Sequence, residues 1–368
     1  MRQHMESSPN SFRARYMRHL QATARWLANS ELSTGGSAAH YTPLIGWSRA
    51  YPETTGYTIP SLIKLAKVLG EPSHEACAVR FGAWLLSIQN SDGSWNGGLH
   101  PNRAGRPSVF NTGQVLKGMH ALWKHDGDRK WLEAGNRGNE WLASRMGDDG
   151  LWGGGDYRSS VTSSYYSHVL WPMLAMAVAD GNDRIHGKVA RGLSTILGRM
   201  LANGVVQGWA FAEKKPAYTH TIAYTIRGIQ ECSRLLGQPE LERAVAPALE
   251  VLVRRSELAA GRLPGAFDES WRPVGNFVCL TGNAQVALSL LLWEGLSPDL
   301  RIVSAAARLV DFVCAQQNLS SRTSGLCGAV AGSTPIYGPY MRFRYPNWAA
   351  KYHCDALMAL IARLDREI

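Results

Sequence analysis

Apolar and polar residues along the chain define two kinds of helical segment. In one kind, such as residues 110–126 and 280–294, apolar residues occur around most of the helix circumference. In the other kind, such as residues 130–144 and 184–202, they fall on one side of the helix. A helix that is apolar all round is buried, whereas a helix with a single apolar stripe is peripheral. The pattern therefore predicts pairs of one inner and one outer helix.

Most of the inner segments end at a glycine, which readily adopts the left-handed conformation that caps a helix. We expect inner helices at residues 54–69, 110–126, 164–180, 220–236 and 280–294, capped by Gly70, Gly127, Gly181, Gly237 and Gly295. We expect outer helices at residues 73–89, 130–144, 184–202, 239–254 and 298–316.

The helix pairs belong to an internal repeat that includes a glycine turn. Residues 81–95 are predicted to form the end of an outer helix and a tight turn that closes at Trp95. Trp84 and Trp141 are 57 residues apart, as are Trp95 and Trp152, and Trp152 and Trp209. A fixed period of this length is typical of a repeat architecture.

The two ends of the chain complete the last pair. Residues 347–364 form an inner-type helix with no outer helix after it, and residues 12–32 form an outer-type helix with no inner helix before it. The sequence therefore predicts an all-α, single-domain (α/α)6 toroid at residues 12–368. It would have six inner and six outer helices, with a flexible tail at residues 1–11. The alternative is an open α-solenoid with capping repeats.

Composition narrows the partners and the compartment. The net charge of +10 favours anionic partners, but the basic residues are scattered and form no run, which argues against nucleic acid. The six cysteines have no paired spacing, and residues 1–11 contain no apolar signal region, so we expect a cytoplasmic protein with reduced thiols. No window has the length and apolar character of a transmembrane segment. No metal-ligand spacing is present, and we expect no metal or cofactor.

Aligning the inner helices places polar residues at one level of the ring. Each follows a small residue, and we expect all of them to face a central cavity. A buried polar group without a partner costs about 1–3 kcal/mol, so this level predicts a polar ligand such as a sugar. The aligned residues are Tyr57, Gln114, His168, Tyr224, Asn283 and Lys351.

Further polar and aromatic residues are predicted to surround the mouth of this cavity. The N-terminal ends of helices carry partial positive charge, and arginine binds carboxylates through two parallel hydrogen bonds. Together with aromatic side chains, these groups suit an acidic sugar such as a uronate. The predicted binding residues, besides Gln114, Asn283 and Lys351, are Trp47, Arg49, Tyr51, Asn111, Tyr166, Arg344, Asn347 and Trp348.

The same region contains candidates for acid–base catalysis. Reaction at C5 of a uronate needs a base that removes the proton next to the carboxylate and an acid that returns a proton or protonates the leaving oxygen. Return of the proton gives an epimerase, and loss of the O4 substituent gives a lyase. Each candidate also has a structural interpretation, such as a hydrogen-bonded core histidine or a carboxylate at a helix start. The candidate catalytic residues are Tyr57, His220, Tyr224, His168 and Glu53.

Two resemblances to known families bear on this hypothesis. Residues 80–95, with Gln89 and the Gly93-Ser94-Trp95 turn, resemble the QW motif of squalene and hopene cyclases. This motif implies the toroid fold, and Trp95, Trp152 and Trp209 would pack on their outer helices or stack on sugars. The DxDD acid motif of those cyclases does not occur in the sequence. Together with the polar ring, this makes a terpenoid cyclase the least favoured function.

The second resemblance is carried by residues 46–53, 109–116, 219–224, 279–285 and 345–351. These stretches resemble VpsJ-like proteins of exopolysaccharide and capsule biosynthesis, some of which are related to glucuronyl C5-epimerases. The resemblance implies an acidic saccharide substrate and partners among polysaccharide-assembly proteins.

Two other functions remain open at this stage. A glycoside hydrolase needs two carboxylates about 5–10 Å apart, and the candidates are Glu53 with Asp156, Glu213 or Asp268. The chain could also be a non-catalytic glycan-binding or scaffold protein of a polysaccharide synthesis complex.

Overall fold

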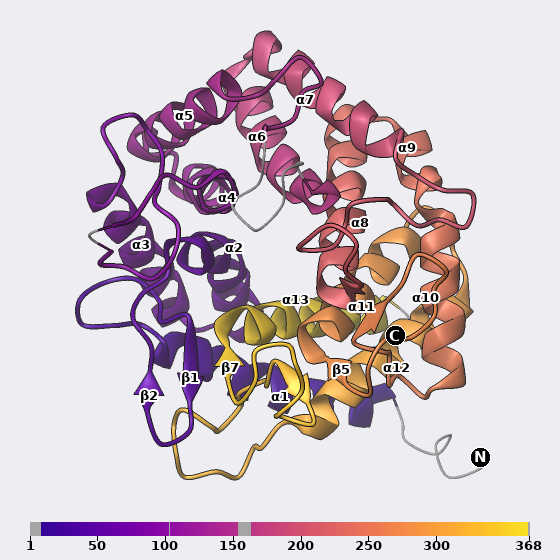
Figure 1. Cartoon of the computed structure of the whole chain (residues 1–368). Coiled ribbons are helices and arrows are strands. Elements are labelled where there is room, and N and C mark those ends of the chain that lie inside the picture. Colours follow the sequence, from indigo (N-terminus) through magenta and orange to yellow (C-terminus); the bar gives the residue numbers. More distant parts are fainter. Residues whose placement is uncertain (1–8, 103, 154–162, 367–368) are drawn as a thin grey trace.

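The computed structural model of the chain describes residues 9–102, 104–153 and 163–366. Within them, six inner helices form a ring in which each helix contacts the next and the last contacts the first (Figure 1). These helices are α2 (Pro52–Leu69), α4 (Val109–Asp126), α6 (Ser167–Asp180), α8 (Thr219–Leu236), α11 (Leu280–Glu294) and α13 (Asn347–Leu364).

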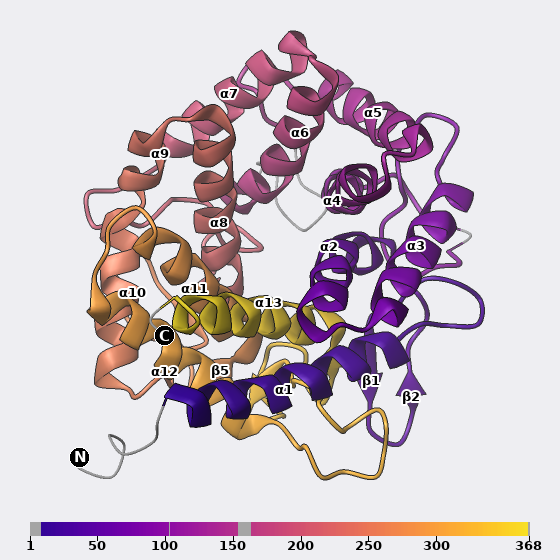
Figure 2. The ribbon, with the colours of Figure 1, turned by 180° about the vertical axis from the view of Figure 1, so that it is seen from behind.

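The outer helices surround this ring, and most of them pack on the inner helix that precedes them in the sequence. One exception is α10 (Ala246–Leu258), which packs mainly on the outer helix α12 (Leu300–Gln316). The other is α1 (Pro9–Asn29), which packs on α13 at the other end of the chain (Figure 2). The described residues thus form the predicted (α/α)6 toroid, closed by the N-terminal helix. The other outer helices are α3 (Pro72–Ser87), α5 (Arg129–Ser144), α7 (Asp183–Leu197), α9 (Pro239–Ala244) with α10 (Ala246–Leu258), and α12 (Leu300–Gln316).

Two local predictions were wrong. Gly295 has a φ of −62°, so the fifth inner helix ends in a further helical turn instead of a left-handed cap. The outer segment at 239–254 is two helices, α9 and α10, which meet at Val245. Pro247 explains the break, because proline lacks an N–H and is tolerated in the first turn of a helix but not in its interior. The other four glycine caps are left-handed as predicted.

Short strands, which the sequence pattern did not predict, hold the entries to several inner helices. β1 (His40–Thr42) pairs with β2 (Gly46–Trp47) and with β7 (Tyr345–Pro346), which leads into α13. β3 (Ala217–Tyr218) leads into α8 and pairs with β4 (Ala266–Phe267). β5 (Val278–Cys279) leads into α11 and pairs with β6 (Ser333–Thr334), and the 3-10 turn η1 (Ser164–Tyr166) leads into α6.

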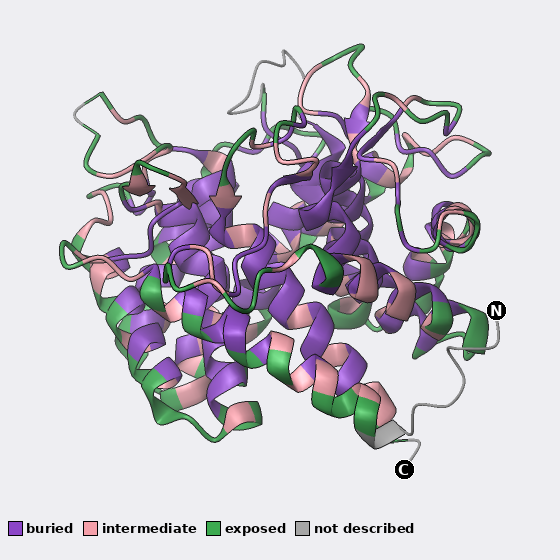
Figure 3. Ribbon diagram, turned by 90° about the horizontal axis from the view of Figure 1, so that it is seen from below, coloured by how far each residue is buried: buried purple, intermediate pink, exposed green. Residues whose placement is uncertain are grey.

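The strands and the long loops gather at one end of the ring, whereas the buried inner helices fill its middle (Figure 3). We call this end, where the inner helices begin, the mouth, and the opposite end the rear. Because the N-terminal ends of the inner helices meet at the mouth, their partial positive charges lie around one opening.

Glycine turns join each outer helix to the next. Gly93 has a φ of +91°, and a Cβ atom on it would lie 2.5 Å from the carbonyl oxygen of Arg137 in α5. Gly328 has a φ of +78°, and a Cβ atom on it would lie 2.3 Å from the carbonyl oxygen of Ala22 in α1. Only glycine fits such a contact, and the last one closes the ring. Equivalent contacts join Gly150 to Gly192, Gly204 to Ala248, and Gly261 to Arg308.

Side chains of the QW-like segment fasten these turns. The indole N–H of Trp95 donates to the Leu85 carbonyl at 2.8 Å. The Gln89 amide donates to the carbonyls of Gly93 and Ala134, each at 2.9 Å, and so ties its own turn to the next outer helix. Trp152 repeats the first bond with Leu142 at 3.1 Å. Trp95, Trp152 and Trp209 are all buried, which supports the structural interpretation of these tryptophans.

Helix α1 begins at Pro9, so the last three residues of the predicted tail are helical, and residues 1–8 lie outside the described residues. Within the part of the chain that the structure describes, no helix combines the length and the apolar character needed to cross a membrane.

Substitution of Gly328 tests the contact that closes the ring. In Gly328→Ala the new Cβ must displace the backbone of α1, in addition to the cost of a left-handed alanine, which is about 1–2 kcal/mol. We expect a loss of about 3 kcal/mol or more in the free energy of unfolding, measured by urea denaturation. The matched control is Gly70→Ala, which has a similar φ of +69° but no atom within 4 Å of the new Cβ. Equal losses in the two variants would contradict the closing contact.

Candidate active site

Three aromatic rings form a stack at the centre of the toroid. Tyr224 of α8 lies 4.2 Å from the ring of His168 in α6, with an angle of 28° between the planes. Its other neighbour is His220, one helical turn earlier on α8, with ring centroids 4.3 Å apart. All three residues are buried. The structure therefore brings together three of the five candidate catalytic residues.

His220 is held in one orientation by Gln285 of α11. Its Nδ1 lies 2.8 Å from Gln285 Oε1, and since that oxygen can only accept, we assign the proton to Nδ1. Nε2 then carries a lone pair and makes no hydrogen bond to a described residue. Burial lowers the pKa of His220 to about 4, although the bond to Gln285 opposes the shift. The ring is therefore neutral at pH 7 and can accept a proton at Nε2.

Tyr340 approaches His220 from the loop before β7. Their ring centroids are 5.2 Å apart, and Tyr340 Oη accepts a hydrogen bond of 2.8 Å from the indole N–H of Trp348. Trp348 lies in the first turn of α13, so the predicted binding residue Trp348 reaches the site through Tyr340. A phenol oxygen that accepts a hydrogen bond is stabilised when it carries negative charge. Tyr340 is therefore a suitable partner for a reacting hydroxyl.

Glu53 provides a carboxylate near the same centre. It lies in the first turn of α2, is buried, and accepts a hydrogen bond of 2.5 Å from the Tyr51 hydroxyl. Its charge contributes to raising the pKa values of both Tyr57 and Tyr224, although burial is the larger cause for each. Both phenols are therefore protonated at neutral pH and can act as proton donors.

His168, the ring at one end of this stack, also contacts Tyr352. His168 Nε2 lies 3.1 Å from the Tyr352 hydroxyl. Burial and the nearby cations Lys117, Lys351 and Arg227 hold the pKa of His168 well below its usual value. The Tyr57 ring lies 5.9 Å from that of Tyr352. His168 and Tyr352 both line a cavity deeper in the ring.

The deeper cavity, which we call the rear cavity, has a volume of about 260 Å³ and is lined by residues of all six inner helices. Lys351 lies in it, with Nζ 2.7 Å from Asp355 Oδ2 and 4.1 Å from the Tyr352 ring centroid. Lys351 is thus inward-facing, as predicted, but its charge is already paired. The burial of Lys351 lowers its pKa, and the carboxylate of Asp355 opposes this.

Four predicted polar residues instead hold parts of the scaffold together. Gln114 donates to the His168 carbonyl at 3.2 Å, and Asn111 donates to the Asn96 carbonyl at 3.1 Å. Asn283 donates to the Gly261 carbonyl at 2.7 Å, and so reaches outward to the glycine turn after α10. Asn347 donates to Ser37 Oγ at 2.6 Å. The expectation that every aligned residue faces the cavity was therefore wrong, because the Asn283 amide N–H reaches outward to a neighbouring repeat instead.

The remaining predicted binding residues lie at the periphery. Trp47 packs on Trp26 of α1 at 4.9 Å and on Tyr41 at 5.2 Å, beside the strands that close the ring. Tyr166 is buried against Phe110 and Trp152. Both rings are thus used in packing. Arg49 is exposed and donates to the Pro101 carbonyl at 2.8 Å, and Arg344 is exposed beside β7.

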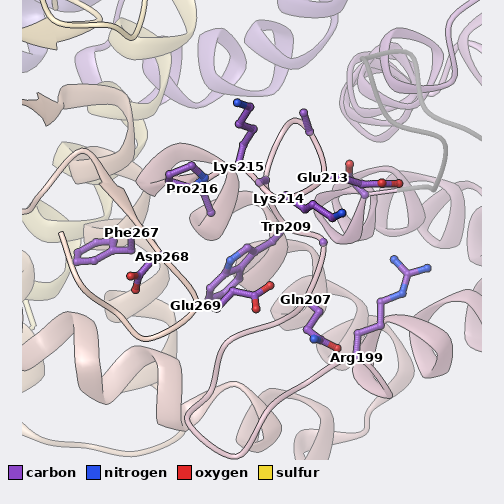
Figure 4. A pocket seen from close by; sticks show the side chains of 15 residues that line it. Arg199, Gln207, Trp209, Glu213, Lys214, Lys215, Pro216, Phe267, Asp268 and Glu269 are labelled. Atoms are coloured by element: carbon purple, nitrogen blue, oxygen red, sulfur yellow. The ribbon is translucent and has the colours of Figure 1, made fainter. Parts of the chain in front are cut away.

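A second cavity, of about 640 Å³, lies between the loops around residues 207–217 and 267–269 (Figure 4). Glu213 and Asp268, two of the predicted hydrolase carboxylates, both line it, but Glu53 does not. Asp268 accepts the backbone N–H groups of Ser270 and Arg272 and pairs with the Arg272 guanidinium at 2.7 Å, so it stabilises its own turn. The third predicted partner of Glu53, Asp156, lies outside the described residues.

Several site residues were not predicted from the sequence. Lys117, Trp171 and Arg227 line the rear cavity and follow Gln114, His168 and Tyr224 by three positions. Positions three apart share one face of a helix, so shifting the aligned level by one turn would have found them. Gln285 follows the aligned Asn283 by two positions, and Tyr340 lies in a loop with no repeat signal.

The comparisons with known proteins concern the fold. No family model and no curated protein matches the sequence. Cellobiose 2-epimerase from Bacillus thermoamylovorans is similar in structure, with a TM-score of 0.78, 11% identity, and coverage of 97% of this chain and 100% of that one. An unsaturated glucuronyl hydrolase responsible for degradation of glycosaminoglycan, from a Bacillus species, has a TM-score of 0.73, 16% identity and 97% coverage of both chains.

A polysaccharide lyase is a third similar structure, with a TM-score of 0.68, 11% identity, and coverage of 98% of this chain and 99% of the other. The similarities extend over nearly the whole chain. At these identities they establish that this protein has the same (α/α)6 toroid fold as all three.

Proposed function

We propose that this protein is an enzyme that acts on an acidic, uronate-containing saccharide by removing the proton at C5, as an epimerase or a lyase. The observation that carries the proposal is His220, whose Nδ1 is held by Gln285 while Nε2 makes no hydrogen bond to a described residue. A neutral imidazole fixed in this way is suited to be a general base.

The proton donor in this proposal is a tyrosine. Tyr224 stacks on His220 and stays protonated because burial raises its pKa well above the usual value. Tyr57 has the same property, and its hydroxyl makes no well-formed hydrogen bond with a described residue. Either phenol would return a proton to the sugar in an epimerase or protonate the leaving O4 oxygen in a lyase. Glu53 would position the sugar hydroxyls or serve as a second base.

The acidic character of the substrate rests on the charge of the protein. The net charge is +10, and six inner-helix N-termini converge on the mouth. Each N-terminus carries roughly half a positive charge, which attracts a carboxylate and stabilises the enolate-like charge that develops when C5 loses its proton. A neutral sugar would gain nothing from this field.

The similar structures support the substrate class. An epimerase, a glucuronyl hydrolase and a polysaccharide lyase all use this fold, so a saccharide is the natural ligand for a polar cavity at its centre. The resemblance to VpsJ-like proteins adds a setting, namely exopolysaccharide or capsule metabolism in the cytoplasm with polysaccharide-assembly proteins as partners. Both the setting and the substrate class are inferred here by analogy with proteins of similar sequence pattern or fold.

A glycoside hydrolase is the second candidate function. Glu53 is a buried carboxylate at the mouth, and one of the similar structures is a hydrolase. The hydrolase is less favoured because Glu213 and Asp268 line a different cavity from the one at the ring centre. A non-catalytic glycan-binding or scaffold role would keep the same cavity and lack turnover. A terpenoid cyclase is disfavoured by the histidines, tyrosines and lysines around the centre.

Incubation with uronic-acid polymers in heavy water distinguishes these functions. Deuterium incorporation at C5, observed by NMR, identifies an epimerase, and ultraviolet absorbance from a new double bond identifies a lyase. We expect one of these two signals with at least one acidic polymer. New reducing ends without either signal would indicate the hydrolase, and binding without turnover would indicate the scaffold role. Either of these last two results would contradict the proposal.

The His220→Gln variant tests the base directly. Removal of a general base typically lowers the rate by a factor of about 10² to 10⁴. We expect a loss of this size in kcat/KM, with an unfolding temperature close to that of the original protein. His125→Gln is the matched control, because His125 lies in the last turn of α4 and pairs with Glu75 at 2.9 Å, far from the mouth. An active His220→Gln variant would exclude His220 as the base.

The Gln285→Glu variant tests how His220 is tuned. A carboxylate at Nδ1 favours the protonated imidazole, so the pKa of His220 should rise from about 4 towards neutral pH. Nitrogen-15 NMR of the histidine rings should record this rise, and the acid limb of the kcat/KM profile should move to higher pH in parallel. If the acid limb of the kcat/KM profile stays in place while the pKa of His220 measured by NMR rises, the limb belongs to another group.

A further inference from the structure

The rear cavity contains more positive than negative charge. Lys117, Arg227 and Lys351 lie inside it, with Lys64 exposed at its rim. Its carboxylates are Glu231 and Asp355. Lys351 pairs with Asp355 at 2.7 Å, and Arg227 pairs with Glu231 at 2.5 Å. Both acids are thus already matched by one cation each.

Lys117 is a buried cation of this cavity without a carboxylate partner among the described residues. It lies in the middle of α4, is only 8% exposed, and has no hydrogen-bond or ion-pair partner among the described residues. Its Nζ lies 4.2 Å from the centroid of the Trp171 ring. Burial, Lys351 and Arg227 together hold the pKa of Lys117 well below its usual value. A buried ammonium in such a place is costly unless an anion accompanies it.

Arg227 faces the same space with unused donors. Its guanidinium carbon lies 5.6 Å from the Trp171 centroid, so two cations approach one indole ring. Its Nη2 is bonded to Glu231, but its Nε and Nη1 are buried without a hydrogen-bond partner in the described residues. His168 Nδ1, which also lines the cavity, is buried in the same way. Unsatisfied buried donors of this kind each cost about 1–3 kcal/mol.

We propose that the rear cavity is a binding site for a small oxyanion, held by Lys117, Arg227 and Lys351 over the face of Trp171. The anion gives Lys117 the negative partner that it lacks and accepts from the free guanidinium N–H groups of Arg227. Charge-assisted hydrogen bonds from arginine and lysine are the usual means of binding phosphate, sulfate and carboxylate groups.

The cavity limits the size and entry of the ligand. At about 260 Å³ it is smaller than typical sites for drug-sized ligands, which are about 300–1,000 Å³. A free oxyanion or a single sugar that carries one fits this space. Apart from His168 at the start of α6, the lining residues come from the second and later turns of the inner helices, whereas His220 and Glu53 lie in first turns. The ligand therefore enters from the rear, past Lys64, and the inference does not depend on the reaction proposed for the mouth.

Calorimetric titration of the intact protein in a non-coordinating buffer tests the site. The probes are inorganic phosphate, sulfate and sodium glucuronate, with glucose as the neutral control. We expect saturable binding of at least one anion and none of glucose. Preference for phosphate or sulfate would identify a free inorganic or phosphorylated ligand, and preference for glucuronate would identify a sugar carboxylate.

The Lys117→Met variant assigns binding to the cavity. Methionine keeps the length of the side chain without its charge, and loss of a charged hydrogen bond should raise the dissociation constant at least about tenfold. In anion-free buffer this variant should unfold at the same temperature as the original protein or higher, because it removes an unpaired buried charge. Lys67→Met, at an exposed position on α2, is the matched control and should bind normally.

If Lys117→Met fails to fold, Lys64→Met at the exposed rim provides the second test. We expect it to raise the dissociation constant of the anion about two- to threefold at low salt, as is usual for the loss of an exposed charge. Absence of binding by all three anions would overturn the proposal. So would an anion that binds Lys117→Met as tightly as it binds the original protein.

Discussion

The contact on which the rest of the structure depends joins a glycine turn to the backbone of the next outer helix, and it occurs at Gly93, Gly150, Gly204, Gly261 and Gly328. Gly93, with its φ of +91°, brings its turn so close to α5 that a single Cβ atom would collide with the Arg137 carbonyl. The same contact recurs around the toroid and ends with Gly328 against α1. Because each outer helix is fixed to its neighbour, the inner helices have one spacing and a common level. The pairing of β1 with β7 adds a second link between the two ends of the chain, and all six cysteines are free.

Closure of the ring explains why polar residues are tolerated at its centre. The stack of His168, Tyr224 and His220 is buried on helices whose positions are fixed from outside, so its rings are held without direct bonds between their polar atoms. Burial then sets the chemistry, since it keeps the histidines neutral and the phenols protonated. In our account the mouth performs proton transfer, and the rear cavity binds an anion.

The fold was predictable from the sequence because its cause is repetitive. Helix pairs, capping glycines and the turn of Gln89 to Trp95 recur at a regular spacing. Single residues broke this pattern at Pro247 and Gly295, and the short strands at the helix entries were not predicted. The site was less predictable. Periodicity showed which residues share a level, but not whether an amide such as Asn283 turns inward or reaches the carbonyl of a neighbouring repeat. Tyr340 and Gln285 depend on contacts between distant segments, which no local pattern encodes.

Native-state hydrogen exchange tests the closed ring most directly. If the turn of Gly328 locks α1 into the toroid, amides in α1 and α13 should open only with the whole protein. Their opening free energies should then equal that of α6, on the opposite side of the ring, within about 1 kcal/mol. An open array would fray from its ends. Opening free energies in α1 and α13 that are several kcal/mol lower than in α6 would contradict the account.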